Sequence, residues 1–315
     1  MPFATVRSAR VIGLLASRGV ELCLAVRPGG EAGLAATVGA CAEAGVRVAL
    51  WPMLADRDGR WACAGNAAAF VDYARGLCDG LASEGVAPAE VVVDLEPPFE
   101  AVRAAVDGPL AAIDLVARRG ARLLGAAARF DDLGGALRDR RIAMSCAVVP
   151  LVAIGPAGAW EAALGTPVSG VAWDHVSAML YSSILEGWSR GLLARRDAVA
   201  VVAAGAREVA LRFGDRSGAS LGAVGVGAFG DEPRLRSPEE LREDVRAARA
   251  AGIDALTLLD LGGVLSRPPA EAWLDAFVGV DEEPLAGPPP VTLRADLAVG
   301  AAAQLARVLA ALRRP

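Results

Sequence analysis

Short apolar runs alternate with longer segments of helical periodicity along most of this chain. Few of the runs show the polar alternation of a half-exposed strand, and near-continuous apolar character is expected of parallel strands covered on both faces. The predicted strands are Glu21–Val26, Val46–Trp51, Glu90–Glu96, Ile142–Val148, Val176–Tyr181, Gly222–Ala228 and Asp254–Asp260. Because parallel strands need crossover connections that are usually helical, the alternation places the chain in the α/β class.

The number of strand–helix units favours a barrel over an open sheet. The alternation runs over about 260 residues, close to the usual length of a (β/α)8 barrel of the TIM type. Seven strands are predicted rather than eight, and the incomplete or missing first strand is placed at the N-terminus, where Pro2–Val6 is a short substitute. The alternative is a doubly wound sheet, which normally carries a glycine-rich phosphate turn. The one candidate for such a turn, at residues 27–30, fits neither the dinucleotide nor the P-loop pattern.

Three segments are predicted along the chain. Residues 1–278 form the barrel domain, residues 279–293 a proline-rich linker, and residues 294–315 a C-terminal helix. The apolar residues near one face of this helix are Leu297, Leu305, Val308, Leu309 and Leu312. Such a face predicts that the helix docks on its own domain, with a partner or a membrane surface as the alternative.

Several classes of chemistry are excluded by what the chain lacks. All 32 basic residues are arginines, whereas Schiff-base and pyridoxal-phosphate enzymes need a lysine amine. His175 is the only histidine, so multi-histidine metal centres are excluded as well. The five cysteines include no Cys-x-x-Cys pair, which predicts free thiols in a reducing compartment. Proton transfer is therefore expected to use carboxylates.

Charge and hydropathy set expectations for partners and location. The formal net charge of −5 argues against a nucleic-acid partner. No uninterrupted apolar stretch reaches about 18 residues, so no membrane span is expected. The N-terminal apolar run Val11–Ala16 is too short for the core of a signal peptide. We expect a cytoplasmic protein whose partner is a small molecule or an oligosaccharide.

Two carboxylates end the predicted strand at residues 90–96. Valines at 91–93 indicate a buried strand, and Asp94 and Glu96 follow with spacing i, i+2. A period of two places both side chains on one face of the strand. Carboxylates beside valines are unfavourable unless they are hydrogen-bonded or functional. The purely structural alternative is that Asp94 caps a neighbouring element while Glu96 lies in solvent.

Two later strand ends supply further candidates at the same end of a barrel. Met179 and Tyr181 share one face of their strand, and Glu186 and Trp188 follow as candidate substrate contacts. Asp260 ends the last strand as a third carboxylate. The structural alternatives are a Met–Tyr pair in the core and an aspartate that is the N-cap of the next helix.

The longest strand-to-helix loop of the first half begins at Trp51. It carries a second tryptophan, Trp61, and two aspartates, Asp56 and Asp58, beside two arginines. Aromatic rings with polar groups around them suit a sugar. The alternative is an Asp-rich turn between packed tryptophans.

These strand ends resemble those of the family 18 glycoside hydrolases, the chitinase-like barrels. The family carries D-x-x-D-x-D-x-E on its fourth strand and M-x-Y-D on its sixth; residues 94–96 match the final D-x-E and residues 179–181 match M-x-Y. The resemblance implies that Glu96 is the general acid, Asp94 its partner, and Tyr181 a group that binds the reacting sugar. The positions of the family's other aspartates in these motifs are occupied by Ala89, Val92 and Ser182.

The leading hypothesis is a glycoside hydrolase-like enzyme that acts on a glycoside or related acetal without a cofactor. Two nearby carboxylates raise the pKa of one of them, which would keep Glu96 protonated while Asp94 carries the negative charge. Asp260, Asp56 or Asp58 would act as the opposing base or nucleophile. One alternative is a Mg²⁺-dependent lyase or hydrolase with Asp94, Glu96 and Asp260 as ligands. The other is a non-catalytic sugar-binding barrel.

Overall fold

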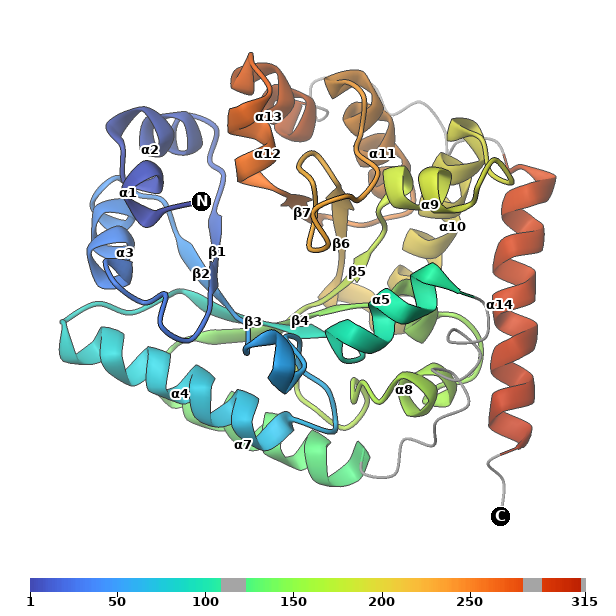
Figure 1. Ribbon diagram of the computed structural model, residues 1–315, viewed down its shortest axis with the longest axis horizontal. Helices are drawn as coiled ribbons and strands as arrows, with labels where there is room; N and C mark the ends of the chain where they lie inside the picture. Colours follow the sequence, from blue (N-terminus) through green and yellow to red (C-terminus); the bar gives the residue numbers. More distant parts are fainter. Residues whose placement is uncertain (109–122, 280–290, 313–315) are drawn as a thin grey trace. The chain divides into compact units, whose positions relative to one another are not determined.

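The structure of the protein is a computed structural model that describes residues 1–108, 123–279 and 291–312 (Figure 1). Most of the predicted linker, residues 280–290, lies outside the described residues. The chain divides into two compact units. Unit 1 comprises Met1–Ala147 and Glu161–Asp174, and unit 2 comprises Val148–Trp160 and His175–Pro315. Both units fall largely within the predicted barrel domain, and each combines strands with helices.

In unit 1 the strands lie side by side in chain order. They are β1 (Leu22–Val26), β2 (Val48–Pro52), β3 (Glu90–Leu95) and β4 (Ala143–Val148). The pairings of β1 with β2 and of β2 with β3 are parallel. The helices that follow β1, β2 and β3 are α3 (Leu34–Glu43), α4 (Ala67–Ser83), α5 (Phe99–Asp107) and α7 (Leu123–Asp139).

The core of unit 1 fills the space between its sheet and its long helices. On β3 the side chains of Val91, Val93 and Leu95 are fully buried on one face. Phe70 of α4 and Phe130 of α7 pack edge to face, with ring centroids 6.1 Å apart. The burial of each such side chain contributes roughly 1.5–3 kcal/mol to stability. The opposite face of β3 is therefore free to carry the polar residues of the strand.

The N-terminal segment corrects one prediction. Pro2–Val6 is not a strand: the chain begins with helices α1 (Phe3–Val6) and α2 (Ala9–Ala16). Ser8 is the N-cap of α2, and its side chain accepts a hydrogen bond from the backbone N–H of Val11. The buried positions 11, 12, 14 and 15 then follow the helical period. The same apolar residues would have alternated poorly in a strand.

In unit 2 three parallel strands also follow chain order. They are β5 (Val176–Met179), β6 (Ser217–Gly222) and β7 (Ala255–Leu259). The helices of this unit are α9 (Ser182–Trp188), α10 (Arg195–Phe213), α11 (Pro238–Ala250), α12 (Leu261–Ser266), α13 (Ala270–Val278) and α14 (Leu293–Ala311). The short helix α8 (Ala159–Leu164) is divided between the units: it begins in unit 2 and continues in unit 1 from Glu161. The seven strands found among the described residues confirm the α/β class and agree with the predicted number.

The sixth strand lies earlier than predicted, whereas the other six agree within two residues at each end. The prediction of Gly222–Ala228 is wrong: β6 ends at Gly222, whose φ of 138° lies in a region that favours glycine. Five of the six residues of the true strand are small and have little strand propensity, yet all six are buried. Packing, rather than propensity, determines its position.

Helix α14 (Leu293–Ala311) lies in the region of the predicted C-terminal helix, but it buries a different set of residues from the apolar face named for that helix. It packs against α10, which belongs to the same unit. The buried residues of α14 are Ala295, Ala306 and Leu309. Of the predicted docking residues, the following are exposed: Leu297, Leu305, Val308 and Leu312. The buried side of α14 thus carries two alanines and Leu309, and Leu309 alone belongs to the predicted face.

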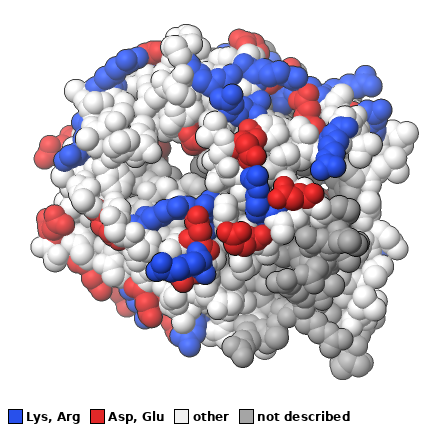
Figure 2. All heavy atoms as spheres, in the orientation of Figure 1, with Lys and Arg blue, Asp and Glu red and all other residues white. Residues whose placement is uncertain are grey.

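Surface and membrane properties complete the description. Among the described residues, no helix combines the length and the apolar character needed to span a bilayer. On the face drawn in Figure 2, arginines are interspersed with acidic side chains and form no continuous basic area. All five cysteines are free thiols, as predicted, and Cys23 is the exposed one.

Candidate functional site

The strongest candidate site begins at the carboxyl end of β3. Since Val91, Val93 and Leu95 occupy the buried face, the alternation of the strand places Asp94 and Glu96 together on the other face. Asp94 is only 3% exposed, and Glu96 is half-buried. The two side chains interact through a hydrogen bond. The strand thus presents two carboxyl groups in contact, one of them almost without solvent.

Burial raises the pKa of Asp94 to about 7, while its hydrogen bond to Glu96 and the nearby indole of Trp51 act in the opposite direction. The indole does not reach hydrogen-bonding geometry. Within the described part of the chain, both Trp51 Nε1 and Asp94 Oδ1 are buried without a hydrogen-bond partner. An unmet buried carboxylate oxygen costs free energy, and such groups are typical of sites that await a ligand or a proton.

The raised pKa lies on the aspartate, whereas the sequence hypothesis assigned the proton to Glu96 and the negative charge to Asp94. Two carboxyl groups in contact share protons, so the pair titrates as a unit and not as two independent acids. Around neutral pH the pair can hold one proton between them. Chemically it can donate that proton and then carry the resulting charge.

A loop fixes the backbone of both acids. The backbone N–H of Ala62 donates to the carbonyl of Asp94 at 2.8 Å, and Glu96 N–H donates to the carbonyl of Ala62 at 3.1 Å. These bonds form a parallel bridge between Ala62 and Leu95, the last residue of β3. The loop between β2 and α4 therefore holds the two carboxylates in place.

Asn66 organises this loop, although it is not among the predicted site residues. Its Oδ1 accepts from the N–H of Cys63 at 2.8 Å. Its Nδ2 donates to the carbonyls of Trp61 and Asp58, at 2.8 and 3.0 Å. The available sequence signal was that Asn66 is the chain's one asparagine and ends the loop.

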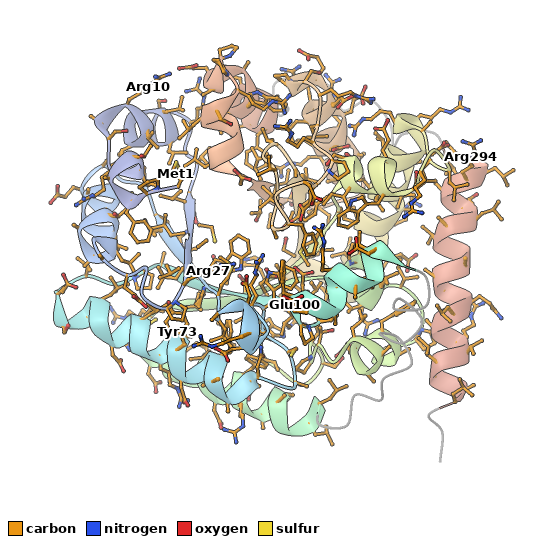
Figure 3. All side chains as sticks on the ribbon, viewed as in Figure 1. Met1, Arg10, Arg27, Tyr73, Glu100 and Arg294 are labelled. Carbon is orange, nitrogen blue, oxygen red and sulfur yellow. The ribbon has the colours of Figure 1, made fainter. Side chains whose placement is uncertain are left out.

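The other predicted residues of the loop are engaged in packing and ion pairs. Arg60 binds both carboxylate oxygens of Asp56, at 2.7 and 2.9 Å, and lowers its pKa. Arg27, which follows β1 (Figure 3), adds a contact to Asp56 at 3.3 Å. Trp61 is 2% exposed and packs edge to face on Phe99. These features favour the packed-turn interpretation over a sugar platform.

Asp58 differs from Asp56 in its environment. It belongs to the short 3-10 turn Asp56–Asp58, and its carboxylate lies 3.6 Å from the guanidinium of Arg57. Both of these side chains are exposed, and an exposed ion pair contributes little to stability. Asp58 is thus an exposed carboxylate in a weak ion pair, in contrast to Asp56, which Arg60 holds at both oxygens.

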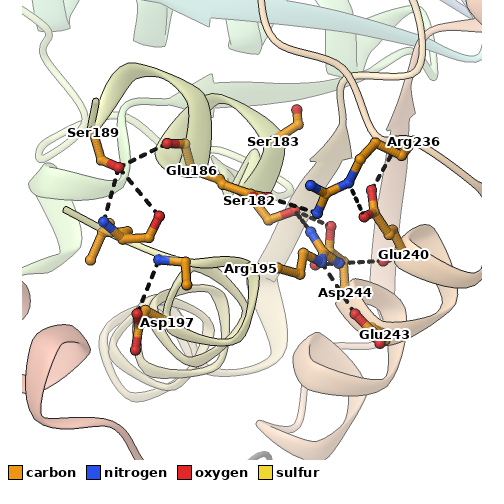
Figure 4. A network of polar contacts seen from close by, with 12 residues as sticks. Ser182, Ser183, Glu186, Ser189, Arg195, Asp197, Arg236, Glu240, Glu243 and Asp244 are labelled. Carbon is orange, nitrogen blue, oxygen red and sulfur yellow. Dashed lines mark hydrogen bonds and ion pairs between the residues drawn. The ribbon is translucent and has the colours of Figure 1, made fainter. Parts of the chain in front are cut away.

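In unit 2, the predicted residues Met179 and Tyr181 lie on one half-exposed face of β5 and its continuation. Tyr181 is the N-cap residue of α9. The next residue, Ser182, occupies the position of the fourth residue of M-x-Y-D. Its hydroxyl donates to Asp244 of α11 and accepts a hydrogen bond of 2.5 Å from Arg195 of α10 (Figure 4). Ser182 therefore ties three helices together.

Asp244 completes this network. It is fully buried, and its second oxygen accepts a hydrogen bond of 2.7 Å from Arg195 Nη2. Burial raises the pKa of Asp244 to about 7, against the opposing effects of Arg195 and Ser182. Both of its carboxylate oxygens are occupied, which the sequence did not indicate because Ser182 and Asp244 are 62 residues apart.

Asp260 behaves as the N-cap alternative predicted. It is the N-cap of α12, and its Oδ1 accepts a hydrogen bond of 2.5 Å from the N–H of Gly263. Glu186 forms an ion pair with Arg236 at 3.2 Å. Trp188 lies beside Phe229, with ring centroids 6.1 Å apart. These residues belong to unit 2, and the Asp94–Glu96 pair belongs to unit 1.

A metal site receives no support from the side chains. Among the residues that the structure describes, no group of three or more His, Cys, Asp or Glu side chains is arranged to hold a metal ion. The alternative of a Mg²⁺ site built from three carboxylates is therefore not favoured.

Comparison with known proteins identifies the fold. No protein-family model matches the chain, and neither does any curated protein. The catalytic domain of a hyperthermophilic chitinase from Pyrococcus furiosus is similar in structure: the match covers 90% of each chain at 13% identity, with a TM-score of 0.50. A GH5-4 broad-specificity endoglucanase from Clostridium longisporum matches over 87% of this chain and 86% of its own at 11% identity, also with a TM-score of 0.50. At these identities the likeness shows the fold: the chain has the α/β fold, with parallel strands, of TIM-barrel-like glycosidase domains.

Proposed function

We propose that this protein is a glycoside hydrolase-like enzyme in which the Asp94–Glu96 pair delivers a proton to the leaving oxygen of a glycosidic bond. The observation that carries the proposal is the buried, unpartnered Oδ1 of Asp94 at the carboxyl end of β3. In α/β barrels, catalytic groups gather at the carboxyl ends of the strands. A buried acid with a raised pKa at that position is suited to proton transfer.

The division of labour follows from exposure. Glu96 is the more accessible of the two acids and is the general acid that reaches the substrate. Asp94 is hydrogen-bonded to Glu96 and supplies charge control from the protein side. As the glycosidic bond breaks, the proton moves from Glu96 to the departing oxygen. Water then adds to the anomeric carbon, and the proton that this water loses returns to the carboxylate pair.

The match of residues 94–96 to the final D-x-E of family 18 supports the same assignment. Because Ala89, Val92 and Ser182 replace other acids of that pattern, the substrate is not fixed by the resemblance. We propose a polysaccharide or oligosaccharide of pyranose sugars. Linear β-1,4-linked oligosaccharides of glucose, mannose and N-acetylglucosamine form a suitable first panel.

The experiment is hydrolysis of this panel by the wild-type protein and by two variants. Glu96→Gln keeps the shape of the side chain and removes its proton, so we expect kcat/KM to fall by about 100-fold or more. Glu100→Gln, an exposed glutamate in the first turn of α5, is the matched control and retains full activity. Release of reducing ends is the measurement. Full activity of Glu96→Gln, or no turnover of any glycoside by the wild type, would contradict the proposal.

A further inference from the structure

Trp188 has an environment unlike that of the other tryptophans. All six tryptophans of the chain lie among the described residues, and only Trp188 is exposed, at 37%. Trp61, Trp160, Trp173 and Trp273 are buried, and Trp51 is half-buried. A large aromatic ring in water is unfavourable, so an exposed tryptophan beside other apolar side chains indicates a binding surface.

The position of Trp188 is fixed by close packing. It ends α9, which follows β5, and Phe229 lies in the segment after β6, so both rings come from the carboxyl ends of neighbouring strands. Gly187 makes this approach achievable: a Cβ at residue 187 would overlap the ring of Pro233. The helix therefore sits directly on the segment that carries Phe229. The two rings lie 6.1 Å apart at an angle of 47°.

The Phe229 segment is braced from within. The carboxylate of Glu232, which is 7% exposed, accepts hydrogen bonds from the N–H groups of Ala228 and Phe229, at 2.9 and 3.2 Å. The N–H of Glu232 itself donates to the carbonyl of Val226 at 3.2 Å. A tight turn held in this way presents Phe229 in a fixed orientation. The aromatic pair is thus preorganised, which lowers the entropic cost of binding.

Polar groups flank the aromatic pair. Glu186, two residues before Trp188, pairs with Arg236 at 3.2 Å. Arg236 is also held by Glu240, through hydrogen bonds from its backbone N–H and its guanidinium (Figure 4). The aromatic pair and this ion pair thus lie on either side of the contact between Gly187 and Pro233, so a chain of several sugars could reach both. An apolar partner could form no hydrogen bonds with these charged groups, whereas the hydroxyls of a sugar can.

From these features we infer that Trp188 and Phe229 form a carbohydrate-binding subsite for a pyranose chain. A pyranose ring has an apolar face of C–H groups and a rim of hydroxyls. One sugar stacks its C–H face on Trp188 with Phe229 at its border, and the hydroxyls of a neighbouring sugar bond to Glu186 and Arg236. The class of ligand assigned to this subsite rests on the proposed function, but binding at the subsite can be measured without hydrolysis.

The test is a binding titration in a Glu96→Gln background, so that the ligand is not cleaved. The probes are β-1,4-linked hexasaccharides of glucose, mannose and N-acetylglucosamine, measured by calorimetry. We expect at least one probe to bind, and the further change Trp188→Ala to weaken its Kd about ten-fold, since one aromatic contact contributes about a decade in affinity. Trp188→Phe retains most of the affinity. Leu211→Ala, at another exposed apolar residue of the same unit, is the matched control and changes nothing.

A second measurement uses the tryptophan without mutation. Because Trp188 is the exposed tryptophan, iodide quenches it preferentially, and a bound hexasaccharide should shield it. Three results would overturn the subsite: no binding of any probe, equal affinity of the Trp188→Ala variant, or bound sugar without shielding. Trp188-dependent self-association in sedimentation would also overturn it and assign the surface to protein contact. Binding that depends on Trp188, together with a wild-type protein that cleaves nothing, contradicts only the proposed function.

Discussion

Asp94 in unit 1 and Asp244 in unit 2 are both buried aspartates, and burial raises the pKa of each to about 7. They differ in what surrounds their oxygens. Asp244 bonds to Ser182 with one oxygen and to Arg195 with the other. Asp94 has one oxygen without a hydrogen bond from the described residues, and its acidic neighbour Glu96 shares a hydrogen bond with it. The comparison teaches that a shifted pKa does not by itself mark a functional acid.

The distinguishing property is whether both carboxylate oxygens have hydrogen-bond partners. A buried carboxylate whose partners are complete is part of the scaffold, because its charge is already compensated. A buried carboxylate with an unmet oxygen stores unfavourable free energy that a proton or a substrate hydroxyl can relieve. On this criterion the two aspartates should respond in opposite ways to mutation: one in activity, the other in stability.

The largest effect is expected from Asp94→Asn. The amide preserves the shape but can neither share a proton with Glu96 nor carry charge. We expect kcat/KM on a cleaved glycoside to fall by about 100- to 10,000-fold. Thermal stability should stay equal or rise, because a poorly solvated carboxylate has been replaced by a neutral group. A loss of stability without loss of turnover would show that Asp94 belongs to the scaffold.

The next largest effect is expected from Asp244→Ala, on stability. Truncation leaves Arg195, itself mostly buried, without its main acidic partner. Breaking a buried ion pair by removing one side typically costs about 3–5 kcal/mol, and the partial exposure of Arg195 places the expected loss near the lower limit. Denaturant unfolding would measure it, with Glu243→Ala, the exposed neighbour that also contacts Arg195, as the control. An unfolding free energy equal to that of the wild type would break the comparison.

The pH dependence sharpens the same contrast. Since proton donation requires a protonated pair, kcat/KM should fall about ten-fold for each pH unit above 7. The effect on stability has the same sign. Both aspartates have a folded-state pKa above the unfolded one, so their contribution is fully present below about pH 4 and is lost as the pH rises through 7. In the Asp94→Asn variant the free energy of unfolding should depend less steeply on pH. The dependence that remains should come from Asp244. A rate that stays flat from pH 6 to 9 would contradict the acid role.

The local parts of this picture could be predicted from the sequence, and the long-range parts could not. Val-Val-Val-Asp-Leu-Glu predicts a buried strand with two acids on one face, because the alternation is a property of the strand alone. The cap at Asp260 was one of two local alternatives for the same reason. The Ser182–Asp244–Arg195 network joins α9 and α10 to α11 across separations of 62 and 49 residues, and no local pattern encodes it. Strand β6 was misplaced because its small residues are selected by packing and not by propensity.

The smallest effect is expected at Asp260, where the sequence left a catalytic and a capping interpretation open. Its carboxylate accepts the N–H of Gly263 at the start of α12, as an N-cap does. Asp260→Ala should therefore lower the unfolding free energy by about 1 kcal/mol and leave kcat/KM within about two-fold of the wild type. Asp260→Ser, which retains an oxygen for the cap, should recover most of the stability. If instead both variants lost as much activity as Asp94→Asn while keeping the wild-type melting temperature, Asp260 would be a catalytic acid in spite of its capping hydrogen bond. Hydrogen-bond partners on the carboxylate would then not separate structural from catalytic aspartates.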